Sequence, residues 1–425
     1  MVNFRFINNE TARNFLTLFT GSALAQLIPF AFEPILTRLF TPSQFAVLAL
    51  YISVANLFVI VATGRYELAI MLPKTNRQSI NIVALSFIIC CGVTLISLLL
   101  ISIFNSDICV LLNNQAVGPF LFLVPLSVLL TGSYQIVNYW MTRQKQFTGV
   151  SAGRVAQTTT NALLNLGTGL LKTGHAGLVW SYLGGLSISF ATIIGFVKKA
   201  DFRQLRLINR KEIKKLAKHY SDFPKINSLH AFTDILQQSL LIFLLSYFFS
   251  DTIVGSYSRT FRLLAAPSSL IGTAIGQVFF QQASSRIARG ESIRTLTLNL
   301  MRGLAFIAIP GFGIVVFFGG PLFSFLLGEA WYTAGLYAGA IAPWLCVNFI
   351  TSPVSTLPLI IGRQKTAFLI SLIGNSLILI SVFYGGYIAH DVVTGFYILS
   401  GAMLVYYAFL IRWFVKLASS SSQQR

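Results

Sequence analysis

The sequence has few charged residues, and this scarcity excludes most classes of soluble protein. Charged residues make up 10% of the 425 positions and hydrophobic residues 55%, whereas a soluble domain carries about 25% charged residues. So few charges cannot cover a water-facing surface, which excludes soluble domains, and so apolar a chain is not disordered. The composition therefore indicates a membrane protein with many spans.

Residues that build catalytic and metal sites are scarce as well. The chain has four cysteines and four histidines, and neither set has the spacing of a zinc site or a disulfide framework, so we expect no metal and no cofactor. A nucleotide-binding Walker A loop is missing, because Gly167–Thr173 lacks a glycine before Lys172. Short outer connections with one acid each predict a protein that is not an enzyme.

Apolar stretches long enough to cross a bilayer recur along the whole chain. A crossing helix needs about 20 mostly apolar residues, and long runs without alternation favour helices over barrel strands. The sequence therefore predicts an all-α polytopic membrane protein, with its longest outer loops near 104–115 and 320–333. The twelve predicted spans lie near residues 14–36, 44–66, 79–103, 116–138, 153–172, 176–197, 228–249, 253–280, 299–319, 334–357, 366–389 and 393–415.

Lysine and arginine alternate between the connections of these spans. With the N-terminus in the cytoplasm, the outer loops hold only Arg38 and Lys172, Arg259 and Arg262 fall inside a span, and the other 27 of the 31 Lys+Arg are cytoplasmic. This is the positive-inside pattern. It predicts twelve spans with both termini in the cytoplasm, and it assigns the net charge of +19 to contact with anionic membrane lipid rather than nucleic acid.

The longest polar connection divides the spans into six and six. We predict an N-lobe over residues 1–200, a basic amphipathic cytoplasmic connection over 201–227 and a C-lobe over 228–425. The string RQK follows the fourth span at Arg143 and the tenth at Arg363. Six is an even number, so both halves enter the membrane from the same side, which predicts parallel repeats that rock about a central site.

The connection itself mixes apolar and basic residues. Leu205, Ile208, Ile213, Leu216 and Tyr220 alternate with seven lysines and arginines. This pattern is typical of an amphipathic helix lying on the inner leaflet, which can serve as a simple tether between the halves or have a regulatory role.

Two arginines stand inside the predicted eighth span, where a charge costs about 2.5–3.5 kcal/mol. Arg259 and Arg262 are three positions apart and so share one helix face. Counted from residue 253 at 1.5 Å per residue, Arg262 lies roughly 14 Å deep, near the middle of the bilayer. We expect both to bind an anionic substrate group such as phosphate; a structural ion pair is the alternative.

Acidic residues near the spans supply candidates for coupling to an ion. Asp234 lies on the seventh span, and Glu33 lies between Pro29 and Pro34 on the first. Either can exchange a proton or cation as the lobes rock, and a plain salt bridge is the alternative for both. Arg65 and Glu67 are candidates at the cytoplasmic mouth, with interfacial anchoring as the simpler interpretation. The Gly-xxx-Gly pairs at 149/153, 272/276 and 335/339 predict close helix packing.

Three segments resemble a known family. They are Gly21–Pro73 with ATGRYELAIMLP, Phe223–Gln282 with SRTFRLLAAPSSLIGTAIGQVFFQQ, and Phe318–Lys365 with SPVSTLPLIIGRQK. They are similar to the Wzx-type O-antigen oligosaccharide flippases, the polysaccharide transporter branch of the multidrug/oligosaccharidyl-lipid/polysaccharide exporter superfamily.

The resemblance implies a function. It implies a flippase of the bacterial inner membrane that moves undecaprenyl-pyrophosphate-linked oligosaccharide, as for O-antigen and lipopolysaccharide, from the cytoplasmic to the periplasmic leaflet. It implies coupling to H⁺ or Na⁺, with the polysaccharide polymerase and chain-length machinery as partners. The family's cationic cavity matches Arg259 and Arg262 here. Related lipid II flippases place arginines deep in spans one and two, whereas span one here has Glu33 and only the outer Arg38.

Three other functions stay open at the level of sequence. A multidrug exporter of the same superfamily binds cationic drugs and prefers an acidic cavity, which the two arginines oppose. A non-transporting membrane component of a polysaccharide assembly complex needs no charges in the core. A polymerase or ligase acting on the same lipid-linked sugars would change product length rather than cause substrate to accumulate on the cytoplasmic face.

Overall fold

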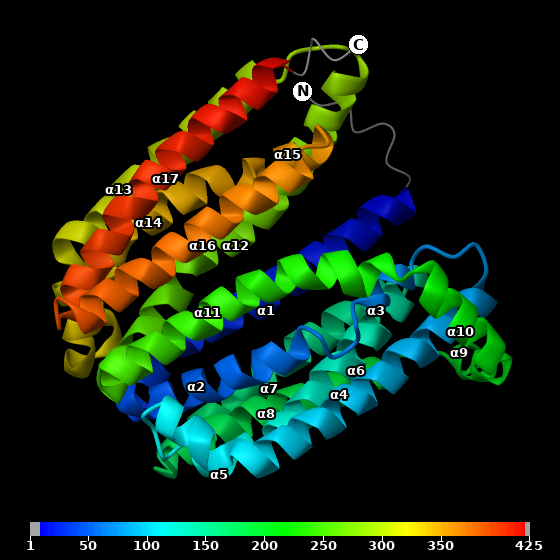
Figure 1. Ribbon diagram of the computed structural model, residues 1–425, viewed down its shortest axis with the longest axis horizontal. Coiled ribbons are helices and arrows are strands. Elements are labelled where there is room, and N and C mark those ends of the chain that lie inside the picture. Colours follow the sequence, from blue (N-terminus) through cyan, green and yellow to red (C-terminus); the bar gives the residue numbers. More distant parts are fainter. Residues whose placement is uncertain (1–8, 421–425) are drawn as a thin grey trace. The chain divides into compact units, whose positions relative to one another are not determined.

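The computed structural model describes residues 9–420, apart from the side chains of residues 9–19, 199, 226, 227, 230, 270, 273, 274 and 420. Both chain ends therefore lie outside the described residues. Within these residues the backbone is all helical, with no strand (Figure 1). The long helices are α1 (Asn9–Leu39), α2 (Pro42–Val59), α4 (Asn76–Leu111), α6 (Val124–Arg143), α7 (Phe147–Leu170), α8 (His175–Gly195), α11 (Ser228–Phe248), α12 (Asp251–Ala288), α13 (Arg294–Leu327), α14 (Tyr332–Thr351), α16 (Gln364–Tyr387) and α17 (Val392–Ser420).

Short elements join these helices. They are α3 (Tyr66–Ala69), α5 (Gly118–Leu121), α9 (Lys199–Gln204), η1 (Leu205–Leu207), α10 (Arg210–His219), η2 (Phe223–Asn227), η3 (Glu329–Trp331), η4 (Ser352–Val354) and α15 (Leu357–Ile360). Nine helical segments among the described residues are both long and apolar enough to cross a membrane. The chain is therefore a multi-pass membrane protein. The nine segments do not include α7, which is more polar, nor α1 and α12, each of which contains side chains outside the described residues.

The chain forms two compact units, and the division falls inside α11. The first unit holds residues 1–40 and 47–239, and the second holds 41–46 and 240–425. In the first unit α7 packs against α1 and α8, and α6 packs against α4 and α8. In the second unit α14 packs against α12, α13 and α17, and α16 packs against α17 (Figure 1).

Helices α4 and α13 extend beyond the apolar stretches from which they were predicted. The expected outer loops at 104–115 and 320–333 were wrong in large part, because helix continues to Leu111 and to Leu327. Each helix leaves regular geometry at one phenylalanine, Phe104 (φ −106°, ψ 15°) and Phe318 (φ −121°, ψ 16°). Hydropathy marks the lipid-facing part of a helix, whereas backbone hydrogen bonds carry the helix further.

Glycine permits the closest helix contacts, as the sequence predicts. A Cβ atom on Gly335 of α14 would lie 2.1 Å from the carbonyl oxygen of Gly319 on α13. Gly149 of α7 lies against Met141 and Phe196 in the same way. Since any side chain would collide there, these glycines set how near the helices approach.

The basic connection is two short helices rather than one. Asn209 ends the first part, because its side chain accepts a hydrogen bond from the N–H of Lys211 and starts α10. Leu216 is then buried within the first unit, where α10 packs on α4. The exposed apolar side chains lie before the break, in a cluster that consists of Phe202, Leu205, Leu207 and Ile208.

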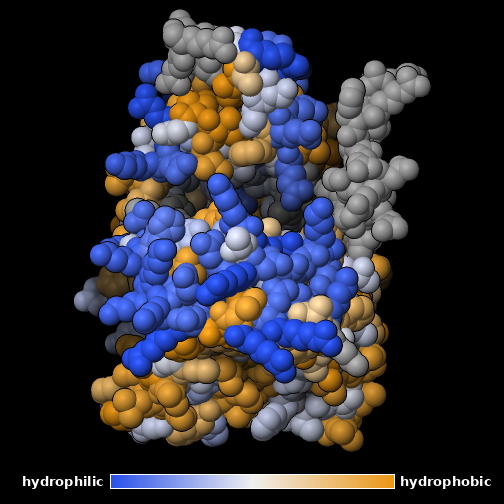
Figure 2. All heavy atoms as spheres, turned by 90° about the vertical axis from the view of Figure 1, so that its right-hand side faces the viewer, coloured by the Kyte–Doolittle hydropathy of each residue, from blue (hydrophilic) through white to orange (hydrophobic). Residues whose placement is uncertain are grey.

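This division changes which part of the connection can meet a membrane. Hydrophilic side chains with hydrophobic ones between them gather on the face where α9 and α10 lie (Figure 2). Arg203, Arg206 and Arg210 are exposed beside the apolar cluster. The sequence pattern over 205–220 predicts one surface helix, but its apolar residues divide into two groups. Leu216 of α10 packs inside the first unit, and only the α9–η1 part presents an exposed apolar surface.

Candidate substrate-binding site

The first half of α12 is held against the start of α2 by a glycine. A Cβ on Gly255 would lie 1.7 Å from the carbonyl oxygen of Pro42, so only glycine permits this contact. One turn later the guanidinium carbon of Arg259 lies 3.5 Å from the ring centroid of Phe45. Phe45 in turn contacts Trp331, with ring centroids 5.6 Å apart. The close approach at Gly255 therefore positions Arg259 on an aromatic pair.

The two predicted arginines of α12 differ in exposure. Arg259 is only 5% exposed, and a cation on an aromatic face in such a place gains up to about 2 kcal/mol. Arg262 is exposed, and no carboxylate of the described second unit forms an ion pair with it. Arg259 is thus partly built into the fold, while the side chain of Arg262 is exposed, and a role in binding a ligand stays a prediction for both.

Aromatic packing determines which face of α12 points into the second unit. Tyr257 stacks on Phe261 and on Phe396, with centroids 5.8 and 5.4 Å apart. The hydroxyl of Thr260 donates to the carbonyl of Ala334, 3.1 Å away. Tyr257, Phe261 and Thr260 face α14 and α17 and so fix the rotation of α12 about its axis. Arg262 therefore lies on the exposed side of the helix.

The predicted coupling acids lie on two different helices. Glu33 is 3% exposed in α1, and the Thr37 hydroxyl donates to its backbone carbonyl at 2.9 Å. Asp234 is half-buried on α11. A role of Glu33 or of Asp234 in coupling to an ion stays a prediction.

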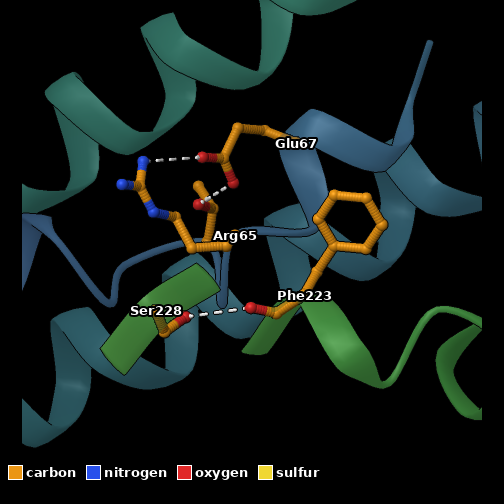
Figure 3. Close-up of polar contacts among 5 residues, drawn as sticks. Arg65, Glu67, Phe223 and Ser228 are labelled. Atoms are coloured by element: carbon orange, nitrogen blue, oxygen red, sulfur yellow. Dashed lines mark hydrogen bonds and ion pairs between the residues drawn. The ribbon is translucent and has the colours of Figure 1, made fainter. Parts of the chain in front are cut away.

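Arg65 and Glu67 do meet, as part of a tight turn between α2 and α4 (Figure 3). Arg65 adopts the left-handed conformation, with φ +60°, and its Nη1 lies 3.7 Å from Oε1 of Glu67. The hydroxyl of Thr63 donates to Oε2 of the same carboxylate. Glu67 is only 2% exposed, so this cluster holds the turn together at the predicted cytoplasmic mouth.

The same turn also holds the basic connection. The Tyr66 hydroxyl donates to the carbonyl of Ala217 in α10, 2.9 Å away, and burial raises the pKa of Tyr66 above its ordinary value. The Asn81 amide donates to the carbonyl of Leu207 and accepts from the N–H of Asn209.

Arg143 donates hydrogen bonds to three carbonyls of the loop after α3, the shortest being to Pro73 at 2.7 Å.

Arg154 is a further cation of the first unit, which the positive-inside pattern assigns to the cytoplasmic side. The helix of the fifth predicted span begins earlier than residue 153, at Phe147 of α7. Arg154 therefore lies two turns inside the helix, about 10 Å from its start. It donates to Ser22 Oγ at 3.0 Å, and Tyr134 and Tyr139 lie close enough to interact with it electrostatically. The polar run Gln157–Asn161 in the sequence indicates that the middle of α7 is less apolar than a typical crossing helix.

Glu67→Ala tests whether the turn cluster is structural. It leaves the Thr63 hydroxyl and the Arg65 guanidinium without their shared acceptor, so we expect a loss of stability of about 1–3 kcal/mol, measured by thermal unfolding in detergent. Glu67→Gln keeps an acceptor and serves as the matched control, with a smaller loss. If Glu67→Gln abolished export while the unfolding temperature stayed unchanged, the carboxylate would instead act in transport.

A family model described as "Polysaccharide biosynthesis protein" matches residues 35–335. The chain belongs to this family. The match includes α2, α12 and the Arg65–Glu67 turn, so these features lie within the part of the chain that defines membership. The resemblance to Wzx-type oligosaccharide flippases is thereby confirmed at the level of the family.

Solved structures with the same fold are transporters and flippases. An inward-facing multidrug resistance MATE family transporter of the MOP superfamily has a TM-score of 0.74 at 13% identity, covering 96% of each chain. The lipid II flippase MurJ in an inward closed conformation has a TM-score of 0.74 at 14% identity, covering 95% of this chain and 90% of that one. A MOP superfamily transporter from Pyrococcus furiosus, described as having a binding pocket of reversed polarity, has a TM-score of 0.52 at 11% identity, with 96% and 95% covered. No curated protein matches by sequence.

These likenesses establish the fold of the MOP superfamily. Identities of 11–14% carry no residue roles, so what this chain transports has to be argued from its own side chains.

Proposed function

We propose that this family member is a flippase for undecaprenyl-pyrophosphate-linked oligosaccharide, such as an O-antigen unit. It moves the substrate from the cytoplasmic to the periplasmic leaflet of the bacterial inner membrane by ion-coupled alternating access. Its product is then taken up by the polysaccharide polymerase and its chain-length machinery.

The exposed guanidinium of Arg262 on α12 carries this proposal. Pyrophosphate is a compact anion, and the planar fork of arginine donates two parallel hydrogen bonds to such oxygens. Arg262 lies eleven residues after the start of α12 at Asp251, about 16 Å along the helix and so near the middle of a bilayer. In a polysaccharide family, a cation at this depth supports an anionic lipid-linked sugar as the substrate.

Twelve crossings account for all the long helices. Helices α1, α7 and α12 are 31, 24 and 38 residues long, enough to cross. Among them, α7 is too polar for the criterion that nine segments meet, while α1 and α12 contain side chains outside the described residues. We assign them as crossings that line a water-filled path, where polar side chains such as Arg154 remain solvated.

Two parallel six-helix repeats account for the matching kinks. α4 and α13 are each the third long helix of their half, and each kinks at a phenylalanine, Phe104 and Phe318. A short element then precedes the fourth helix in both halves, α5 in one and η3 in the other. An even number of helices per repeat puts both chain ends on the same side of the membrane, and the positive-inside pattern favours the cytoplasm.

Glu33 and Asp234 are the proposed coupling acids, and Asp234→Asn is the sharper test. The variant cannot bind or release a proton or a cation, so we expect export that no longer follows an imposed pH or Na⁺ gradient. Glu33→Gln is expected to act in the same direction. Asp251→Asn at the start of α12 is the control variant and should keep the wild-type gradient dependence. Unchanged gradient dependence in both Asp234→Asn and Glu33→Gln would remove these residues from the coupling mechanism.

A multidrug exporter is the second candidate function, favoured by the likeness to a MATE transporter. Arg259 and Arg262 oppose it, since they repel cationic drugs. Proteoliposomes separate the two proposals. With lipid-linked oligosaccharide in the membrane, an imposed ion gradient should move the saccharide across it. Gradient-driven uptake of a cationic dye with no saccharide movement would favour the drug exporter.

A further inference from the structure

The second half of α12 borders an open cavity of about 670 Å³ inside the second unit. Its opposite wall is formed by η4, which follows α14, and by the residues before α15. This size lies within the range of about 300–1,000 Å³ typical of small-molecule sites. We call it the hydroxyl groove, after five of its lining residues: Ser268, Ser269, Ser352, Ser355 and Thr356.

Glycine shapes the groove. A Cβ on Gly272 would lie 2.6 Å from Ser352 Oγ, whereas one on Gly276 would have room, 3.5 Å from the carbonyl oxygen of Pro353. Gly272 therefore lets Ser352 of η4 approach α12 closely. The approach brings the hydroxyls of two separate chain segments around one space.

Two hydroxyls of the groove have unused hydrogen-bonding capacity. Ser268 is 9% exposed, and its Oγ has no hydrogen-bond partner among the described residues, nor has Oγ1 of Thr356. Ser352 and Ser355 donate to backbone carbonyls at 3.3 and 2.7 Å, so their oxygens remain available as acceptors. The groove thus offers both donors and acceptors to a ligand, and a buried hydroxyl without a partner is costly.

The chemistry of the lining selects a neutral, hydroxyl-bearing ligand. Among the described residues no charged side chain lines the groove, so none of them neutralises a phosphate or a cation there. A lipid tail would leave the hydroxyls unsatisfied. Sugar hydroxyls donate and accept at once, Gln277 adds an amide, and the ring of Phe280 gives an apolar surface for a pyranose face.

The position along α12 links the groove to Arg262. Ser269 follows Arg262 by seven residues, so both lie on the same side of the helix. Ser268 is about 9 Å and Gln277 about 22 Å further along the axis. We propose that the hydroxyl groove binds the first sugars of the lipid-linked oligosaccharide while Arg262 holds its pyrophosphate; this rests on the function proposed above.

Binding by the purified full-length protein tests the proposal with two probes. One is the lipid-linked oligosaccharide extracted from cells that lack this protein, and the other is undecaprenyl pyrophosphate without sugar. Ser268→Ala/Thr356→Val removes both unpartnered hydroxyls at nearly constant shape. We expect it to weaken binding of the saccharide-bearing lipid by about tenfold or more, with binding of the sugar-free lipid unchanged. Ser285→Ala, an exposed hydroxyl of α12 outside the groove, should match the wild type with both probes.

The outcomes separate this inference from the proposed function. If the wild type binds neither probe, the proposed function fails, and the inference fails with it. If the wild type binds both and the double variant binds the saccharide-bearing lipid equally well, only the groove assignment is overturned. An equal loss for both probes would also overturn it, since the groove would then act on the phosphate end or on the fold. Thermal unfolding of each variant, expected to be unchanged, identifies a loss caused by misfolding.

Discussion

Arg262→Glu is expected to abolish surface polysaccharide export while the protein still inserts into the membrane at wild-type level. The side chain is exposed on α12, so reversal of its charge leaves the packing of the helix intact. It replaces an attraction for pyrophosphate by a repulsion. Loss of a paired charge in a desolvated site costs about 2–5 kcal/mol, so substrate affinity should fall about 30-fold or more. Surface polysaccharide on intact cells and protein abundance in isolated membranes are the two measurements.

Three variants make this result specific. Arg262→Lys keeps the charge but loses the bidentate fork, so we expect partial export. Arg302→Glu reverses another exposed arginine, on α13, and should export normally. Arg259→Glu places an anion over the ring of Phe45 and should lower both export and abundance. Normal surface polysaccharide in the Arg262→Glu strain would remove Arg262 from the transport pathway.

Gly335→Val is expected to have the largest effect on the fold. A Cβ at this position would lie 2.1 Å from the carbonyl oxygen of Gly319 and 2.8 Å from Cα of Gly320. Both are backbone atoms of α13, so no side chain can move aside. The two helices must separate, and we expect a destabilisation of more than about 3 kcal/mol, seen as low membrane abundance and a lower unfolding temperature in detergent.

Gly313→Val is the matched control on α13, because no other atom lies within 4 Å of a Cβ built there. It makes the same change of residue type in open space and should leave abundance close to wild type. Equal abundance of the two variants would mean that α13 and α14 do not cross as closely as these contacts indicate.

The long helices could be predicted from the sequence because hydropathy is local information. Each predicted span overlaps one of the long helices from α1 to α17. Their ends could not be predicted, since backbone hydrogen bonding continues beyond the apolar residues. This is why α4 extends past Phe104 and why Arg154 lies two turns inside α7 rather than at its mouth.

Contacts between distant residues decide what a site can do, and they leave no local signal. Spacing put Arg259 and Arg262 on one face, but only the packing of α12 on residues 41–46 places Arg259 over Phe45. The hydroxyl groove likewise joins α12 to Ser352–Thr356, more than 70 residues away in the chain. The Arg65–Glu67 pair could be predicted from the sequence, because the two residues are only two positions apart. The Thr63 hydroxyl, which donates a hydrogen bond to Glu67, completes the cluster.

The leaflet on which lipid-linked oligosaccharide accumulates shows most directly whether this protein flips that substrate across the membrane. Cells that lack this protein would be compared with cells that carry the wild type or Arg262→Ala, using a reagent that labels only periplasmic sugars. We expect unlabelled, cytoplasm-facing substrate without the protein and with Arg262→Ala, and labelled substrate or finished polysaccharide with the wild type. Labelled but unpolymerised units in cells without the protein would contradict it, because flipping would then proceed in its absence.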